Sequence, residues 1–167
     1  MFNILATCLL IAATLSAAAI DVRTRRIPNA LTGSLAVAAI VLHIPAGLGA
    51  VLLAFATLLC VFALGTIAFR FGWFGGGDVK LIAAACGMVS YPGSIGFLED
   101  VLVAGALLAL GTALVRGRLA FLLRSTVNVA MYGMTPQSPS LPYGVAIAAG
   151  SVVYSISLLF PKLRVGI

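Results

Sequence analysis

Long apolar stretches occupy most of this chain, and short polar clusters separate them. Six such stretches can be traced in the 167 residues, at 1–20, 30–43, 48–69, 79–89, 101–115 and 143–160. Charged residues make up only 8% of the chain, whereas ordinary soluble domains contain about 25%. A soluble domain of this size has too few interior positions for so much apolar surface, and a transmembrane helix needs about 20 apolar residues. The sequence therefore predicts an all-α polytopic membrane protein with about six transmembrane helices and no soluble domain.

Basic residues are concentrated in three of the connections between these stretches. Eight of the ten lie in or beside the connections after the first, third and fifth stretches: Arg23, Arg25, Arg26, Arg70, Lys80, Arg116, Arg118 and Arg124. The other two, Lys162 and Arg164, follow the last stretch. Because positively charged loops are retained in the cytoplasm, we expect these three connections to be cytoplasmic and both termini to lie outside. The first stretch is then an uncleaved transmembrane helix. Topology thereby explains the net charge of +6, and no basic patch with interleaved aromatic residues points to nucleic acid.

Two stretches and one connection have unusual lengths. The stretches at 30–43 and 79–89 are short for a full bilayer, so we expect them to thin the membrane or to leave a hydrated notch beside them. Pro28 is expected as the first residue of the second helix, where its missing N–H is no disadvantage. In the long connection 116–142, apolar side chains alternate with arginines and small polar residues. This pattern predicts an amphipathic helix at the membrane interface.

The cysteines, the histidine and the tryptophan have structural explanations. Cys8, Cys60 and Cys86 lie inside apolar stretches without the spacing of a disulfide framework or a zinc site. We therefore expect three buried small side chains, and no metal or other cofactor. Trp73 is expected to be an interfacial anchor, and His43 is expected to lie at the interface near the outer end of its stretch.

Only four acidic residues occur in the chain, and two of them share a predicted membrane depth. Glu99 and Asp100 are adjacent and are expected in an outside loop. Asp21 ends the first stretch and Asp78 opens the fourth, so the predicted topology places both at the cytoplasmic edge. Taken singly, Asp21 is explained as a solvated helix end that pairs with Arg25, and Asp78 as a helix N-cap.

Taken together, the two aspartates suggest chemistry. If the carboxylates of Asp21 and Asp78 approach within a few ångström, like-charge repulsion raises one pKa and the pair shares a proton. One carboxylate can then take a proton from water while the other polarises a carbonyl group. Such a pair hydrolyses peptide bonds without a metal or a covalent intermediate. The acid and the base cannot be assigned from the sequence, because a coupled pair titrates as a unit.

Residues around Asp78 are candidates for supporting roles. Three glycines precede it directly: Gly75, Gly76 and Gly77. They can adopt positive φ and would let an extended substrate strand approach the backbone, or they form a flexible linker. Lys80 either extends to the lipid headgroups or biases the charge of the pair. Asn29 either caps the second helix or orients a carboxylate.

Three ordered segments resemble motifs of the type IV prepilin peptidases. Residues 21–29, DVRTRRIPN, resemble the first-aspartate motif, and residues 75–80, GGGDVK, match the GxGDxK motif. Residues 141–150, LPYGVAIAAG, are similar to the segment that opens the last helix in the short TadV/CpaA-like branch. That branch serves the tight-adherence (Flp) type IV pilus. The resemblance covers nearly the whole chain.

The resemblance implies a GxGD aspartyl endopeptidase whose catalytic pair is Asp21 and Asp78. It also implies supporting or substrate-binding positions at Gly75, Gly76, Gly77, Lys80, Arg26, Pro28 and Asn29. The implied substrates are prepilins or pseudopilins. Their basic leader is removed at the cytoplasmic face of the bacterial inner membrane, typically after a glycine and just before the hydrophobic helix.

Larger members of the family also carry a soluble region with paired cysteines, and they N-methylate the new terminus. This chain has no such cysteine motif and no room for the region, so we expect a single peptidase domain over 1–167 without methylation. Two interpretations from other functional classes remain open: a non-catalytic pilus-assembly scaffold and a small proton-coupled transport subunit. The second would need ionisable groups near the bilayer midplane, and the central residues of the predicted spans contain none.

Overall fold

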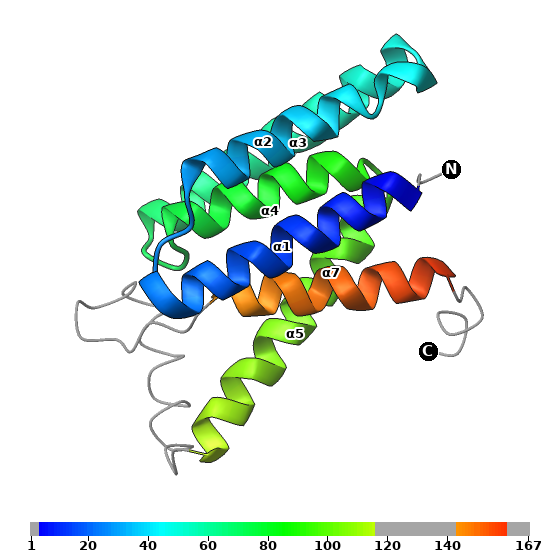
Figure 1. Cartoon of the computed structure of the whole chain (residues 1–167). Coiled ribbons are helices and arrows are strands. Elements are labelled where there is room, and N and C mark those ends of the chain that lie inside the picture. Colours follow the sequence, from blue (N-terminus) through cyan, green and yellow to red (C-terminus); the bar gives the residue numbers. More distant parts are fainter. Residues whose placement is uncertain (1–3, 116–142, 160–167) are drawn as a thin grey trace.

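The computed structural model describes residues 4–115 and 143–159, which form a bundle of helices (Figure 1). The helices of this part are α1 (Ile4–Thr24), α2 (Asn29–Val41), α3 (Leu48–Arg70), α4 (Gly76–Val89), α5 (Gly93–Val115) and α7 (Tyr143–Leu159), with a 3-10 turn, η1 (Ile44–Ala46), after α2. Each predicted apolar stretch corresponds to one helix. The all-α prediction is therefore confirmed, while the amphipathic helix expected at 116–142 lies outside the described residues.

Four helical segments of the described part are long and apolar enough to cross a membrane. They are Ile4–Thr24, Asn29–Ala46, Leu48–Arg70 and Gly93–Thr112. The chain is thus a polytopic membrane protein, as predicted. The total number of spans and their orientation stay predictions.

The two short stretches differ from isolated short spans, for a separate reason in each case, while the membrane thinning or hydrated notch expected beside them stays a prediction. The second helix gains η1 at its end, so that Asn29–Ala46 reaches spanning length. The fourth helix is short but is enclosed by protein, because Val79, Leu81 and residues 83–89 are all buried. A helix covered by its neighbours does not need to match the lipid thickness.

Three expected boundaries also change, because hydropathy marks the apolar part of a helix and not its full hydrogen-bonded length. Helix α1 continues past Asp21 to Thr24, and α2 begins at Asn29 with Pro28 as its N-cap instead of its first residue. Helix α5 begins at Gly93, so Glu99 and Asp100 lie inside a candidate span and not in an outside loop. The candidate span Gly93–Thr112 therefore contains two ionisable residues that the predicted stretch 101–115 did not include.

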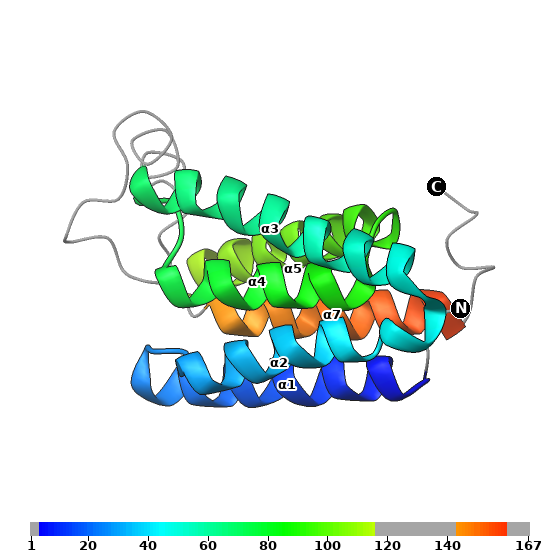
Figure 2. The same ribbon diagram turned by 90° about the horizontal axis from the view of Figure 1, so that it is seen from above.

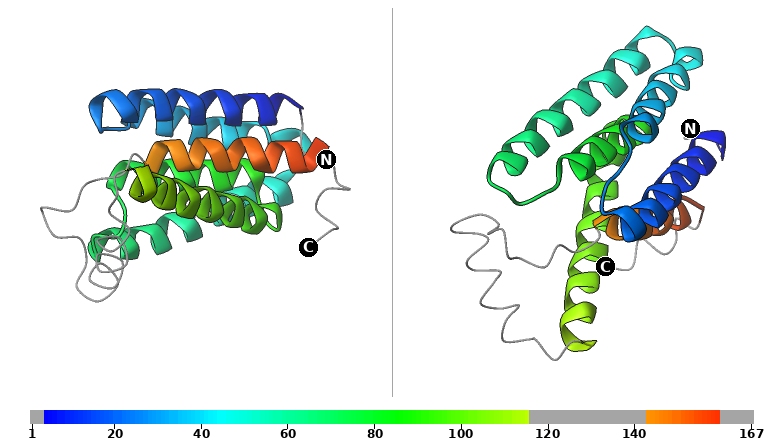
Figure 3. Two further views of the ribbon diagram at one scale, coloured as in Figure 1. Left: turned by 90° about the horizontal axis from the view of Figure 1, so that it is seen from below. Right: turned by 60° about the vertical axis from the view of Figure 1, so that its left-hand side comes forward.

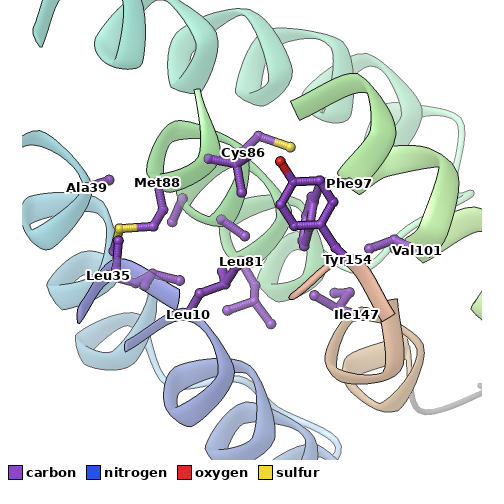
Figure 4. Packing of buried hydrophobic residues seen from close by; sticks show 14 of the residues in the cluster. Leu10, Leu35, Ala39, Leu81, Cys86, Met88, Phe97, Val101, Ile147 and Tyr154 are labelled. Atoms are coloured by element: carbon purple, nitrogen blue, oxygen red, sulfur yellow. The ribbon is translucent and has the colours of Figure 1, made fainter. Parts of the chain in front are cut away.

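Helices α4 and α7 organise the bundle. Helix α4 packs against α2, α3 and α5, and α7 packs against α1 and α5 (Figure 2). Their buried side chains meet in one core, to which α1, α2, α4, α5 and α7 contribute (Figure 4). In this core the rings of Phe97 and Tyr154 meet edge to face, with their centroids 5.8 Å apart. The core thus fixes α7, the last described helix, against segments from the first half of the chain.

Close packing between α7 and its neighbours depends on small and polar residues. A Cβ atom on Gly150 would lie 2.6 Å from the Cα atom of Val101 in α5. The buried hydroxyl groups of Thr14 in α1 and Ser151 in α7 are 2.7 Å apart and share a hydrogen bond. In membranes, small residues and interhelical hydrogen bonds take over much of the role that the hydrophobic effect has in water.

The expectation of three buried cysteines is correct only for Cys86, because Cys8 and Cys60 are exposed on the helix surface. An apolar stretch identifies a span but not which of its faces turns toward the bundle. Trp73 is exposed beside the ring of Phe71, at a centroid distance of 5.6 Å. A ring nitrogen of His43 lies 2.6 Å from the carbonyl oxygen of Ala39.

We expect Gly150→Ala to lower the unfolding temperature in detergent, because its methyl group would enter the backbone of Val101. Overpacking of this kind destabilises by about 1–3 kcal/mol. The matched control is Gly111→Ala in α5, where a Cβ atom meets nothing within 4 Å. Thermal unfolding of both variants checks the prediction. Equal melting of Gly150→Ala and Gly111→Ala would contradict the tight α5–α7 crossing.

Candidate active site

Asp21 and Asp78 come from two helices that present their ends on the same side of the bundle. Asp21 lies in the last turn of α1 and is buried. Asp78 is the third residue of α4 and is half-buried. Helix α7 also begins at this end (Figure 1). The two residues that the sequence places at one membrane depth are thus brought to one place in the fold.

The start of α7 holds Asp21. The backbone N–H of Gly144, the second residue of α7, donates a hydrogen bond to Oδ2 of Asp21 at 3.0 Å. The first N–H groups of a helix have no partner within it, and they carry the positive end of the helix dipole. A Cβ atom on Gly144 would lie 3.0 Å from both Cβ and Oδ2 of Asp21. Glycine at this position therefore lets the N-terminus of α7 approach the carboxylate.

The start of α4 holds Asp78 in a similar way. Gly75 is the N-cap residue of α4, and its backbone forms a hydrogen bond with the Asp78 carboxylate. This contact is one half of a capping box, in which the third residue of a helix reaches back to the N-cap N–H. The explanation of Asp78 as the N-cap itself is therefore wrong.

The two carboxylates are close enough to interact electrostatically. Asp78 precedes the apolar run of α4, which begins at Val79. Burial, and after it the negative charge of Asp21, raises the pKa of Asp78 from an ordinary 3.8 to about 6, while the hydrogen bond from Gly75 lowers it. Both effects penalise the charged form of the carboxyl group. At least one member of the pair is thus suited to keep a proton in mildly acidic solution.

Tyr143 adds an aromatic hydroxyl to the same place. Its ring contacts that of Phe74, just before the glycines, at a centroid distance of 5.5 Å. Its hydroxyl group lies within electrostatic range of the Asp78 carboxylate. Neither Tyr143 nor Gly144 was among the site residues predicted from the sequence. Both belong to the segment LPYGVAIAAG, whose resemblance to the family was the sequence signal that could have identified them as site residues.

Lys80 and Asn29 contact each other instead of the carboxylate pair. Nζ of Lys80 donates a hydrogen bond to Oδ1 of Asn29 at 2.8 Å. Asn29 does not cap α2, because Pro28 is the N-cap and no side chain caps that end. Two residues along a helix correspond to about 200° of rotation, so Lys80 and Asp78 occupy different faces of α4. The Lys80–Asn29 contact links α2 to α4.

The glycines before Asp78 do not use the positive φ that is open to them, and two of the three are helical instead of forming a linker. Gly76 and Gly77 are the first two residues of α4, and the residues with positive φ lie elsewhere. A Cβ atom on Gly77 would lie 3.1 Å from the Cβ atom of Ile27. Its lack of a side chain therefore lets α4 approach the connection between α1 and α2.

The remaining residues of the first motif lie in that connection. Arg26 is exposed, and its carbonyl oxygen accepts a hydrogen bond from the hydroxyl of Thr24 at 3.1 Å. Ile27 is partly buried against the core. The following Pro28 has φ −64° and ψ 135°, which turns the chain into α2. Among the described residues, no three His, Cys, Asp or Glu side chains gather as metal ligands.

We expect Asp21→Asn to lower the pKa of Asp78, because it removes the neighbouring charge that raises it. Burial still acts on the carboxyl group, so the new value should lie between 3.8 and about 6. The chain has only three aspartates, and carbon-13 NMR of aspartate-labelled protein can follow the titration. The control is Glu99→Gln, in which the acidic residue is exposed on α5. An unchanged titration of Asp78 in Asp21→Asn would show that the two carboxylates do not interact.

Comparison with known proteins agrees with the resemblance seen in the motifs. The family model described as the type IV leader peptidase family (Peptidase_A24) matches residues 8–134. No curated protein and no solved structure matches the chain. The matched range includes Asp21, Asp78 and the contacts of Lys80, while Gly144 lies beyond it. Because the match covers more than half of the chain, this membrane protein belongs to the type IV leader peptidase family.

Proposed function

We propose that the chain is an aspartyl endopeptidase in which Asp21 and Asp78 form the catalytic pair. It removes the leader of prepilins or pseudopilins of the Flp type, at the cytoplasmic face of the bacterial inner membrane. The observation that carries this proposal is the arrangement of two carboxylates at one end of the bundle, each held by a backbone hydrogen bond at the start of a helix, with the charge of Asp21 acting on Asp78. Membership of the leader peptidase family supports the reaction class and a prepilin as the substrate.

The proposed reaction uses the pair as an acid and a base. The ionised carboxylate takes a proton from a water molecule, and the water oxygen attacks the carbonyl carbon of the scissile peptide bond. The protonated partner donates its proton to the carbonyl oxygen, which gives a neutral tetrahedral intermediate. When this intermediate collapses, the C–N bond breaks and the now protonated carboxyl group gives its proton to the leaving amine. One hydroxyl of the intermediate gives its proton to the ionised partner, which restores the starting state of the pair.

The surroundings of the pair suit this cycle. The raised pKa lets Asp78 keep a proton at a pH at which an ordinary carboxyl group has lost it. The Gly144 N–H holds the carboxylate of Asp21 in a fixed orientation, and fixed geometry is a large part of catalytic efficiency. The two aspartates exchange roles as the proton moves, so the pair is the functional unit.

A scaffold without catalysis would use the aspartates only as ion-pair partners for nearby basic residues. Lys80 gives no support to that alternative, because its ammonium group donates to Asn29 and occupies another face of α4. A proton-coupled transport subunit would use ionisable groups deep in its spans. Asp100 of α5 lies in a candidate span, so a transport assay belongs in the test.

We expect Asp21→Asn and Asp78→Asn each to reduce leader removal by about 100-fold or more, the range that acid–base groups contribute. Each variant is co-expressed with a prepilin that the unaltered chain processes, and the two forms of the pilin are separated on a gel. Glu99→Gln serves as the control, and membrane levels of all variants must match. Retained cleavage in either aspartate variant contradicts the proposal. An aspartate-dependent proton flux without any substrate protein would support a transport subunit instead.

We expect Gly144→Ala to reduce cleavage by about 100-fold as well, because its methyl group would displace the Asp21 carboxylate. A displacement of about 1 Å in an active site can have an effect of this size. The control is Gly49→Ala in α3, where the added Cβ atom meets nothing within 4 Å. Both variants are assayed on the same prepilin after their melting temperatures have been compared. Full activity of a folded Gly144→Ala variant would show that α7 does not position Asp21.

A further inference from the structure

A groove between α5 and α7 begins close to the aspartate pair. It has a volume of about 400 Å³, and apolar side chains from both helices form most of its lining. Figure 3 shows that α5 crosses the bundle steeply and that its C-terminal part extends beyond the other described helices. Leu107 and Leu114 in that part of α5 are 65% and 56% exposed.

The direction of the groove follows from two contacts between its walls. Gly150 meets Val101 and Gly105 meets Ala146, so α5 and α7 run antiparallel. The near end of the groove on α7 is Val145. This residue directly follows Gly144, which binds Asp21.

The far end of the groove lies farther along the bundle, away from the end that carries the aspartates. It is formed by Val153 on α7 and by Asp100 on α5. At 1.5 Å per residue, the distance from Val145 to Val153 is about 12 Å, or two turns of a helix. The groove therefore leads from the aspartate pair into the apolar part of the bundle.

The lining of the groove fits a helix better than lipid chains. Ala104, Ala146 and Ala149 lie in it, and small residues allow helix backbones to approach closely inside a membrane. Asp100 is also part of the lining, and acidic side chains within spans rarely face lipid. An apolar substrate helix matches both features, because its backbone can approach the alanines closely and its polar atoms can lie near Asp100.

We propose that this groove binds the first two turns of the apolar substrate helix that follows the scissile peptide bond. The inference rests on the proposed function, which places that bond between Asp21 and Asp78. The chain on the C-terminal side of the bond then starts next to Val145, and the groove continues from there. The substrate helix is thereby recognised separately from the leader, which stays at the end of the bundle.

A second groove is less suited to this occupant. It lies over α4 between α2 and α3, and its lining includes Gly33, Leu58 and the Lys80–Asn29 pair. Lys80 occupies a face of α4 different from that of Asp78, so this groove does not continue from the carboxylates. It provides a matched control for a variant that fills a groove.

The first test fills the α5–α7 groove with Ala149→Phe, since Ala149 is exposed on α7. Two substrates are compared in detergent: a full-length prepilin, and a short peptide that contains the cleavage junction but lacks the apolar helix. We expect kcat/KM for the prepilin to fall by about tenfold or more beyond any change for the peptide. The control variant Gly33→Phe, at a position with nothing within 4 Å, should change neither. Equal effects of Ala149→Phe on both substrates, or none on either, would overturn the proposal.

The second test identifies what lies in the groove. A photoreactive residue replaces Leu107 in the Asp78→Asn background, and uncleaved prepilin is co-expressed. A cross-link to the prepilin, absent when the photoreactive residue replaces Gly33, supports the proposal. A cross-link to residues 116–142 of the same chain would assign the groove to that segment, and a cross-link between two chains would assign it to a second copy. The absence of any protein adduct would assign the groove to lipid. Each of these three results would overturn the proposal.

Failure of this inference is distinguishable from failure of the proposed function. If the aspartates are not catalytic, Asp21→Asn still cleaves the short peptide, whatever the groove contains. If only the groove assignment is wrong, the aspartate variants lose activity toward both substrates, while Ala149→Phe changes kcat/KM for the prepilin and for the peptide by the same factor.

Discussion

The hydrogen bond from Gly144 to Asp21 joins two segments that are 123 residues apart. It forms only because α7 packs along α1, and that packing depends on the Thr14–Ser151 hydrogen bond and on small residues where the helices meet. The same helix is held from its other side by α5, which Gly150 allows to approach closely. The position of one carboxylate is thus a consequence of how the last described helix packs into the bundle.

Bringing a second carboxylate to this place is electrostatically unfavourable: burial raises the pKa of Asp78, and the negative charge of Asp21 raises it further. The fold offsets part of this repulsion with backbone donors. Gly144 and Gly75 each hold a carboxylate at the start of a helix, where the dipole favours negative charge. Helix ends supply this positive potential without a basic side chain, so Lys80 is free to link α2 with α4.

Much of the candidate site could be predicted from the sequence, because few charges occur in an apolar chain and their positions follow from topology. Asp21 and Asp78 were identified in this way, and the structure brings them together. Hydropathy failed where polar residues continue a helix, as at Glu99 and Asp100 in α5. It also failed for Cys8 and Cys60, since composition cannot tell which face of a span turns inward.

The sequence by itself determined the all-α membrane class and singled out the two acidic residues that share a predicted membrane depth. Those properties depend on local composition and on the order of polar clusters along the chain. Only the tertiary structure decided that Gly144 holds Asp21, that Gly77 admits Ile27, and that a groove leads away between α5 and α7. These are contacts between distant segments, and their geometry is set by how side chains of particular size pack, which no local pattern encodes.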